Sequence, residues 1–167
     1  MVDLKGQYDA IKETVNTSIQ EVLNTNAYIN GPQVHSFQKS LETYLGVKHV
    51  IPCANGTDAL QIAMMGLDLK PGDEVITADF TFAATVEVIA LLQLTPVLVD
   101  VDMNNMNISL DGIRKAITPK TKAIVICNPG NPTGYLYSQA ELEQLRDIVK
   151  KHDLFLFADE VYREFCY

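Results

Sequence analysis

A helix start suited to holding an anion is the first chemical feature of the sequence. The tetrapeptide Asn-Gly-Thr-Asp, which ends at Asp58, joins an apolar segment to a helical pattern. Gly56 lets a ligand approach the backbone closely, and the amides of Thr57, Asp58 and the next residue open the helix. Such amides bind a phosphate or another small anion without a cationic side chain, and the Thr57 hydroxyl adds a contact. The alternative is a plain N-cap provided by Asn55 or Thr57.

The loop Asn128–Gly134, with the sequence Asn-Pro-Gly-Asn-Pro-Thr-Gly, is the most specific string in the chain. Its two prolines and two glycines restrict the backbone to an unusual course, so Asn131 is presented from a rigid loop. An ordinary turn is the alternative, although a turn does not need this density of constraint.

A carboxylate and an aromatic ring complete the candidate site. Asp159 follows the apolar segment Leu154–Ala158, and a carboxylate at the end of a buried strand is costly without a partner. A protonated pyridine nitrogen is one such partner, and the ion pair would keep that ring an electron sink. The alternative for Asp159 is a helix N-cap. Phe82 could stack on a flat ring, or it could belong to the core.

Alternating apolar and helical segments predict how these groups are positioned. Apolar strands separated by helices indicate a parallel sheet that is covered on both faces. Ligands bind beyond the carboxyl ends of such strands, and the polar clusters fall there. The expected fold is α/β, a three-layer αβα sandwich with a mainly parallel sheet of about five strands. Strands are expected at His49–Cys53, Glu74–Ala78, Pro96–Val101, Thr121–Cys127 and Leu154–Ala158.

The domain organisation follows from the same pattern. No internal repeat or linker interrupts the chain, so residues 1–167 are expected to form a single domain. Two helices are expected within residues 1–46, and the alternating strand and helix core within residues 47–167. The helical patterns cover Gln7–Leu23, Val34–Leu45, Asp58–Leu67, Phe82–Leu92, Leu110–Ile117 and a segment from the capping box Ser138–Glu141 to Lys151.

Composition argues against several classes of function. The net charge of −8 disfavours a nucleic-acid partner, which needs a clustered cationic surface. No apolar run reaches the roughly 18 residues of a membrane span. The three histidines lack metal-ligand spacing, so no metal site is expected. Cys53, Cys127 and Cys166 are expected to be buried free thiols of a cytoplasmic protein.

Together these residues resemble fold type I enzymes that depend on pyridoxal phosphate (PLP). Residues 3 to about 123 are similar to nucleotide-sugar aminotransferases of the DegT-like family. Residues from about 125 to 167 instead resemble class I aminotransferases of the aspartate aminotransferase type, so the sequence reads as a hybrid, or chimera, of two relatives. The first similarity rests on Asp3-Leu-Lys-Gly-Gln-Tyr, Tyr28-Ile-Asn-Gly-Pro, Asn55-Gly-Thr-Asp-Ala-Leu and Thr81-Phe-Ala-Ala-Thr. The second rests on the loop Asn128–Gly134 and on Asp159-Glu-Val-Tyr162.

The resemblance implies a role toward PLP for each candidate residue. The helix start would hold the cofactor phosphate, and an aromatic ring would stack on the pyridine. Two side chains would hydrogen-bond the phenolic oxygen of the ring, and a carboxylate would pair with the ring nitrogen. In that order the residues are Gly56, Thr57 and Asp58, then Phe82, then Asn131 and Tyr162, and finally Asp159.

Both families use a Schiff-base lysine that lies beyond the aspartate, and this chain ends eight residues after Asp159. The sequence therefore predicts a truncated PLP-binding scaffold that has no catalytic residue and no turnover of its own. The alternative is an aminotransferase fragment that becomes active with a complementing chain. A nicotinamide-binding domain is a weaker alternative, because Gly-x-Gly-x-x-Gly does not follow the segment His49–Cys53.

The position of the chain end also bears on the sheet. In the resembled fold, the neighbours of the first and fifth strands would come after Tyr167. We expect His49–Cys53 to pair in parallel with Leu154–Ala158, which gives the order 1-5-4-2-3 across the sheet. The alternative is a homodimer that covers the exposed strand edges.

Overall fold

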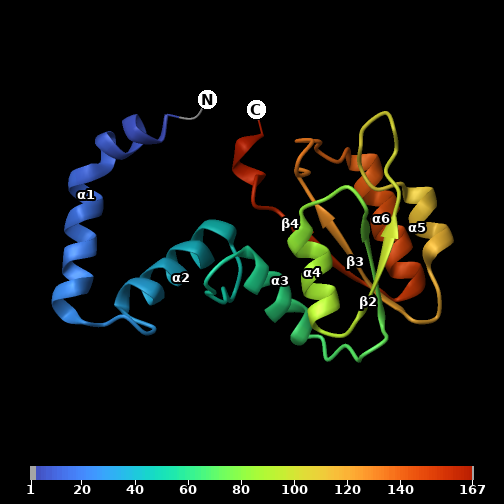
Figure 1. Cartoon of the computed structure of the whole chain (residues 1–167), viewed down its shortest axis with the longest axis horizontal. Coiled ribbons are helices and arrows are strands. Elements are labelled where there is room, and N and C mark those ends of the chain that lie inside the picture. Colours follow the sequence, from blue (N-terminus) through green and yellow to red (C-terminus); the bar gives the residue numbers. More distant parts are fainter. Residues whose placement is uncertain (1–2, 167) are drawn as a thin grey trace. The chain divides into compact units, whose positions relative to one another are not determined.

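A computed structural model describes residues 3–166 and divides the chain into two compact units. The first unit is Met1–Pro52 and the second is Cys53–Tyr167. Figure 1 shows both units and labels most of their helices and strands. Within the described residues, no helix is long and apolar enough to cross a membrane.

Two helices, α1 (Leu4–Thr25) and α2 (Pro32–Leu45), make up most of the first unit. Asp3 caps α1, because its carboxylate accepts a hydrogen bond from a backbone amide of the first turn at 2.9 Å. Pro32 starts α2 at a position where no amide hydrogen is needed, and Gly46 follows its end with a φ of 65°. Both helices lie where the apolar periodicity predicts them, and no described residue of either is buried.

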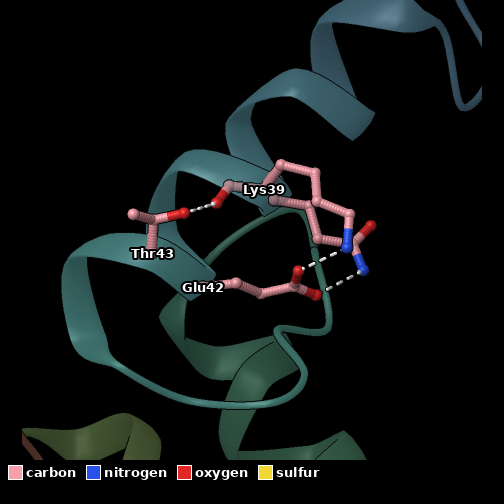
Figure 2. Close-up of polar contacts among 4 residues, drawn as sticks. Lys39, Glu42 and Thr43 are labelled. Atoms are coloured by element: carbon pink, nitrogen blue, oxygen red, sulfur yellow. Dashed lines mark hydrogen bonds and ion pairs between the residues drawn. The ribbon is translucent and has the colours of Figure 1, made fainter.

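Figure 2 shows polar contacts formed by α2. The Lys39 ammonium lies 2.7 Å from the Glu42 carboxylate, about one helical turn away. The Gln38 side-chain amide donates to the other carboxylate oxygen at 3.5 Å, and the Thr43 hydroxyl donates to the Lys39 carbonyl oxygen at 3.0 Å. The hydrogen bond from Lys39 holds the pKa of Glu42 below its usual range. Because the Lys39 side chain is exposed, solvent weakens this ion pair.

The second unit contains a four-stranded parallel sheet. Its strands are β1 (Glu74–Ala78), β2 (Thr95–Val99), β3 (Thr121–Cys127) and β4 (Phe155–Asp159), in the order β2-β1-β3-β4. All three pairings are parallel, and Ile76 lies opposite Val97 on one side and Ile124 on the other. The α/β fold class, the parallel sheet and the relative order of these four strands are as the sequence predicts.

The predicted first strand is wrong, and the sheet has four strands rather than about five. Residues 49–53 belong to no strand, so the predicted pairing with Leu154–Ala158 does not form and β4 is an edge of the sheet. Pro52 has no amide hydrogen to donate to a ladder, and Ile51 is 70% exposed. An extended apolar segment becomes a strand only when a neighbour pairs with its backbone, and the local sequence does not encode that neighbour.

Helices cover both faces of the sheet and form the predicted three layers (Figure 1). Alternate residues of a strand point to opposite faces, so β1 and β3 each contribute to two separate apolar clusters. The cluster under α3 (Gly56–Met65) and α4 (Ala83–Leu91) consists mainly of Met64, Val75, Val88, Ile89, Ala123 and Val125. The cluster under α5 (Leu110–Ala116) and α6 (Gln139–His152) consists mainly of Ile76, Val99, Ile113, Ile124, Leu145 and Ile148.

A capping box begins α6, as the sequence predicts. The Ser138 hydroxyl oxygen accepts from the Glu141 amide at 3.3 Å, and the Glu141 carboxylate accepts from the Ser138 amide at 2.7 Å. The Tyr135 hydroxyl also donates to this carboxylate, at 3.0 Å. Burial raises the pKa of Glu141, but the hydrogen bonds from Ser138 and Tyr135 outweigh burial and hold the pKa below its usual range.

Replacing Ser138 with alanine is expected to lower the free energy of unfolding by about 1 kcal/mol, because α6 loses a cap acceptor. Equilibrium denaturation in urea at pH 7 measures the change. The matched control is Ser18→Ala, in the middle of α1, where no cap is lost. Equal losses in the two variants would contradict the capping role of Ser138.

Candidate functional site

One cavity of about 360 Å³ lies at the carboxyl ends of β3 and β4. Its wall is formed by the starts of α3 and α4, the end of β3, the loop that follows β3 and the segment that follows β4. All of these segments belong to the second unit. Six of the seven residues that the sequence predicts for a site line this cavity. They are Gly56, Thr57, Phe82, Asn131, Asp159 and Tyr162.

The start of α3 forms the side of the cavity where an anion is expected. Asn55 caps the helix, since its side-chain oxygen accepts from the Asp58 amide at 2.9 Å. The Asn55 side-chain amide also donates to the Asp58 carboxylate at 3.2 Å, and Asp58 does not line the cavity. A Cβ added to Gly56 would meet no atom within 4 Å, so a ligand can reach the backbone there. The amides that suit an anion are therefore those of Gly56 and Thr57, whereas the Asp58 amide serves the cap.

Asp159 ends β4 and lies beside Cys127 of β3 in the parallel register. Its backbone oxygen accepts from the Asn128 amide at 2.9 Å, and its carboxylate accepts from the Val161 amide at 3.2 Å. Among the residues that the structure describes, no cationic side chain pairs with this carboxylate. The next helix, η1 (Arg163–Phe165), starts four residues later, so Asp159 is not a helix N-cap. A cationic group of a ligand at this point would therefore meet a carboxylate that forms no ion pair with the described residues.

The loop Asn128–Gly134 brings Asn131 to the cavity. The Gly130 amide donates to the first carbonyl oxygen after the loop at 2.8 Å, and the Gly134 amide donates to the Gly130 oxygen at 2.7 Å. Gly134 has a φ of 71°, which side chains with a Cβ rarely adopt. The Asn131 side-chain amide donates to the Tyr162 hydroxyl at 3.4 Å. The two residues expected to hold the same ligand oxygen are therefore direct neighbours.

Phe82 precedes α4 and lines the cavity with 54% of its surface exposed, so its interpretation as a core residue is wrong. Leu60, Ala84 and Val161 also line the cavity, and the sequence reasoning did not identify them. Leu60 lies one turn after Gly56 on α3, so helical spacing from the expected phosphate site is a signal that would have found it.

Cys127 is a titratable residue of the cavity that sequence reasoning also missed. All three cysteines are free, but the prediction of buried thiols is wrong for Cys53 and Cys166, which are exposed. The half-buried Cys127 thiol donates to the Pro129 carbonyl oxygen at 3.2 Å. Burial raises the pKa of the Cys127 thiol, and the negative charge of Asp159 raises it further.

Alkylation of Cys127 by iodoacetamide is expected to reach half its maximal rate at a pH above the usual thiol range. Asp159→Asn is expected to lower that midpoint, because it removes a negative charge that disfavours the thiolate. Peptide mass spectrometry measures the rates in a background that carries Cys53→Ser and Cys166→Ser. The matched control is Glu160→Gln, one residue along and outside the cavity wall. An equal shift in the control would contradict the role of Asp159.

The donors and acceptors at the wall fit PLP. Backbone amides suit the phosphate, an exposed ring suits stacking, an amide with a hydroxyl suits the phenolic oxygen, and a carboxylate suits the ring nitrogen. In the part of the chain that the structure describes, no lysine lines the cavity. Nor do the residues described include a group of three or more His, Cys, Asp or Glu side chains that could hold a metal ion.

Comparison with known proteins identifies the family. The model of the DegT/DnrJ/EryC1/StrS aminotransferase family matches residues 9–161, and the chain belongs to this family. It is 42% identical over 159 residues to the UDP-2-acetamido-2-deoxy-3-oxo-D-glucuronate aminotransferase of Pseudomonas aeruginosa. The aligned residues cover 95% of this chain and 42% of that relative. The chain thus spans about 42% of the length of the curated relatives that it matches.

Solved structures agree with the family and with the fold. A DegT DnrJ EryC1 StrS aminotransferase from Brucella abortus has a TM-score of 0.82 at 38% identity, over 94% of this chain and 42% of that one. NtdA from Bacillus subtilis, with bound cofactor PMP, has a TM-score of 0.79 at 34% identity, over 90% of this chain and 33% of that one. An aspartate aminotransferase from Thermus thermophilus has a TM-score of 0.59 at 32% identity, over 62% of this chain and 27% of that one.

The matches give no support to a hybrid of two parents. One family match runs across residues 9–161 and therefore passes the expected junction near residue 124. The likeness to the aspartate aminotransferase covers a smaller share of the chain. Because these relatives share the same fold, similarity to both of them does not require a junction.

Proposed function

We propose that this chain forms the cofactor-binding part of a PLP-dependent aminotransferase that acts on a nucleotide-linked sugar. The observation that carries the proposal is the gathering of separate segments around one cavity, each with a group that PLP needs. When bound, PLP supplies a ring that stores electrons and a carbonyl that is exchanged for an amino group. Two relatives support the proposal, since one is named as an aminotransferase of a UDP-sugar and another contains PMP.

Each residue at the wall has a task in holding and orienting the cofactor. The amides of Gly56 and Thr57 bind the phosphate at the positive end of the α3 dipole. Asp159 pairs with the ring nitrogen and keeps its proton in place. The Asn131 side-chain nitrogen and the Tyr162 hydroxyl oxygen, which lie 3.4 Å apart, would both hydrogen-bond the phenolic oxygen. The aromatic ring at the start of α4 stacks on the pyridine.

The 167-residue chain by itself is expected to bind PLP without turnover. A PLP enzyme needs a lysine that bonds to the cofactor and moves protons, and none of the described lysines lines the cavity. Transaminase assays with amino acids and 2-oxo acids measure this, and turnover by the purified chain alone would contradict it. A complementing chain that supplies the lysine is the alternative route to activity.

Titration with PLP tests the proposal directly. We expect saturable binding that inorganic phosphate weakens by competition, and borohydride treatment is expected to label scattered surface lysines rather than a single one. Gly56→Ala is expected to weaken binding without lowering stability, because its new methyl group enters the phosphate space and meets no protein atom within 4 Å. The matched control is Gly66→Ala at the end of α3, outside the cavity. Failure of the wild-type chain to bind PLP saturably would overturn the proposal.

A cytoplasmic homodimer is part of the same proposal. The three thiols are free, as a reducing compartment requires. The edge strand β4 exposes Phe155 and Leu156, and a second copy that covered this edge would pair its open backbone groups. Sedimentation equilibrium is expected to give twice the mass of the chain, and a monomer at all concentrations would contradict the dimer.

A further inference from the structure

A second, much smaller cavity lies behind the loop that carries Asn131. Its volume of about 20 Å³ is enough for one water molecule. The end of β1, part of β3, the loop after β3 and the segment between β2 and α5 bound it. An antiparallel bridge between Val101 and Ile108 holds that last segment. Asn131 and Cys127 line both this cavity and the cofactor cavity.

The side-chain nitrogen of Asn107 is buried at this cavity, and it has no hydrogen-bond partner among the residues described. The Asn107 backbone amide, in contrast, donates to the Asn105 side-chain oxygen at 3.0 Å. Burial raises the pKa of Tyr137, and a side-chain contact with Asn107 partly offsets that rise. The distance and angle of a full hydrogen bond from the Asn107 side-chain nitrogen are nevertheless met by no described residue. An unpaired buried donor is costly, and native proteins pair such groups with protein or with ordered water.

We propose that this small cavity binds one ordered water molecule, which accepts a hydrogen bond from Asn107 and links it to the loop of Asn131. Thr77, Thr81 and Asn131 line the same cavity, and their hydroxyl and amide groups are the kind of further partner that a buried water needs. A water-mediated contact is nearly as favourable as a direct one. Asn107 is therefore a positioning residue for Asn131, although it does not line the cofactor cavity.

The size and the chemistry of the cavity select water over other ligands. Neither a phosphate nor a cofactor ring fits a space of about 20 Å³, whereas the neighbouring cavity measures about 360 Å³. The unpaired group at the wall is an N–H donor, which repels a metal cation and requires an acceptor. A water oxygen accepts that hydrogen bond, and its two hydrogens can be donated to hydroxyl or amide oxygens.

Oxygen-17 magnetic relaxation dispersion on the full chain counts long-lived buried waters without any cofactor. Asn107→Leu removes the donor and fills the space, so it is expected to lose one such water relative to the wild type. Asn107→Asp keeps the size and lets the water donate instead, so it is expected to keep the water. The matched control is Asn104→Leu, at an exposed position of the same segment, which is also expected to keep it.

An unchanged water count in Asn107→Leu would overturn the proposal. A crystal structure of the wild-type chain is the second measurement, and it decides the question even if Asn107→Leu does not fold. The expected result is density for one water within hydrogen-bond distance of the Asn107 nitrogen. An empty cavity, or a direct bond from that nitrogen to a protein oxygen, would overturn the proposal.

The effect on Asn131 rests on the proposed function, and PLP titration tests it separately. Asn107→Leu is expected to weaken PLP binding about threefold, the net contribution of one lost hydrogen bond. Asn107→Asp and Asn104→Leu are expected to bind PLP as the wild type does. If the wild type does not bind PLP, the proposed function fails while the water count stands. If Asn107→Leu loses the water but keeps its PLP affinity, the positioning role is overturned.

Discussion

Replacing Asp159 with alanine is expected to weaken PLP binding about thirtyfold, a loss of about 2 kcal/mol. This carboxylate ends β4 at the cavity wall, and none of the described cationic side chains pairs with it. A hydrogen bond between two charged groups is about twice as strong as a neutral one, so its contact with a protonated ring nitrogen should dominate binding. Isothermal titration calorimetry with PLP at pH 7 measures the loss.

Two further variants isolate the cause of that loss. Glu160→Ala removes the same charge from the next residue, which contacts Arg163 at 3.4 Å and does not line the cavity. Its PLP affinity is expected to change by less than about twofold. Asp159→Asn keeps the size and removes the charge, so an intermediate loss is expected. Equal weakening in Glu160→Ala and Asp159→Ala would mean that overall charge, rather than a specific pair, controls binding.

Replacing Ile76 with alanine is expected to lower the free energy of unfolding by about 3 kcal/mol. Ile76 is fully buried in the middle of β1, which is paired with β2 on one side and β3 on the other. The substitution leaves a space that the close-packed sheet and helices cannot collapse to fill. The midpoint of thermal unfolding is expected to fall by about 6–12 °C for a chain of this size.

Ile62→Ala provides the matched comparison, because the same atoms are removed from a side chain that is 45% exposed on α3. Its loss of stability is expected to stay below about 1 kcal/mol. Circular dichroism at increasing temperature follows both variants beside the wild type. Similar melting points for Ile76→Ala and Ile62→Ala would contradict the packing of Ile76 in the core.

The central strands were predicted most accurately. The ranges Glu74–Ala78 and Thr121–Cys127 agree with the structure at both ends. These strands are rich in β-branched residues and lie between neighbours on both sides, so local propensity and tertiary pairing favour the same residues. The edge strands differ from the prediction by one or two residues, because each is paired on one side only and the register with that neighbour sets its ends.

The candidate site was largely predictable for a topological reason. Parallel strands place their carboxyl ends on one edge of a sheet, so polar residues that directly follow apolar segments gather there. Asn131 and Asp159 reach the same cavity by this rule although they are 28 residues apart in the sequence. The alternation of apolar strands with helices, and the residue types that follow each strand, are local properties that can be read from the sequence.

The sequence by itself determined the fold class, the two central strands and the residue types at the strand ends, because each depends on local periodicity and turn chemistry. Only the tertiary structure decided that His49–Cys53 forms no strand, that Asp58 serves a cap outside the cavity, and that Cys127 faces it. It also decided the burial of the Asn107 side-chain nitrogen. Each of these features depends on which distant segments of the chain lie next to the residue concerned. Strand pairing, burial and cavity walls are made by contacts between such segments, and no local window of sequence contains those contacts.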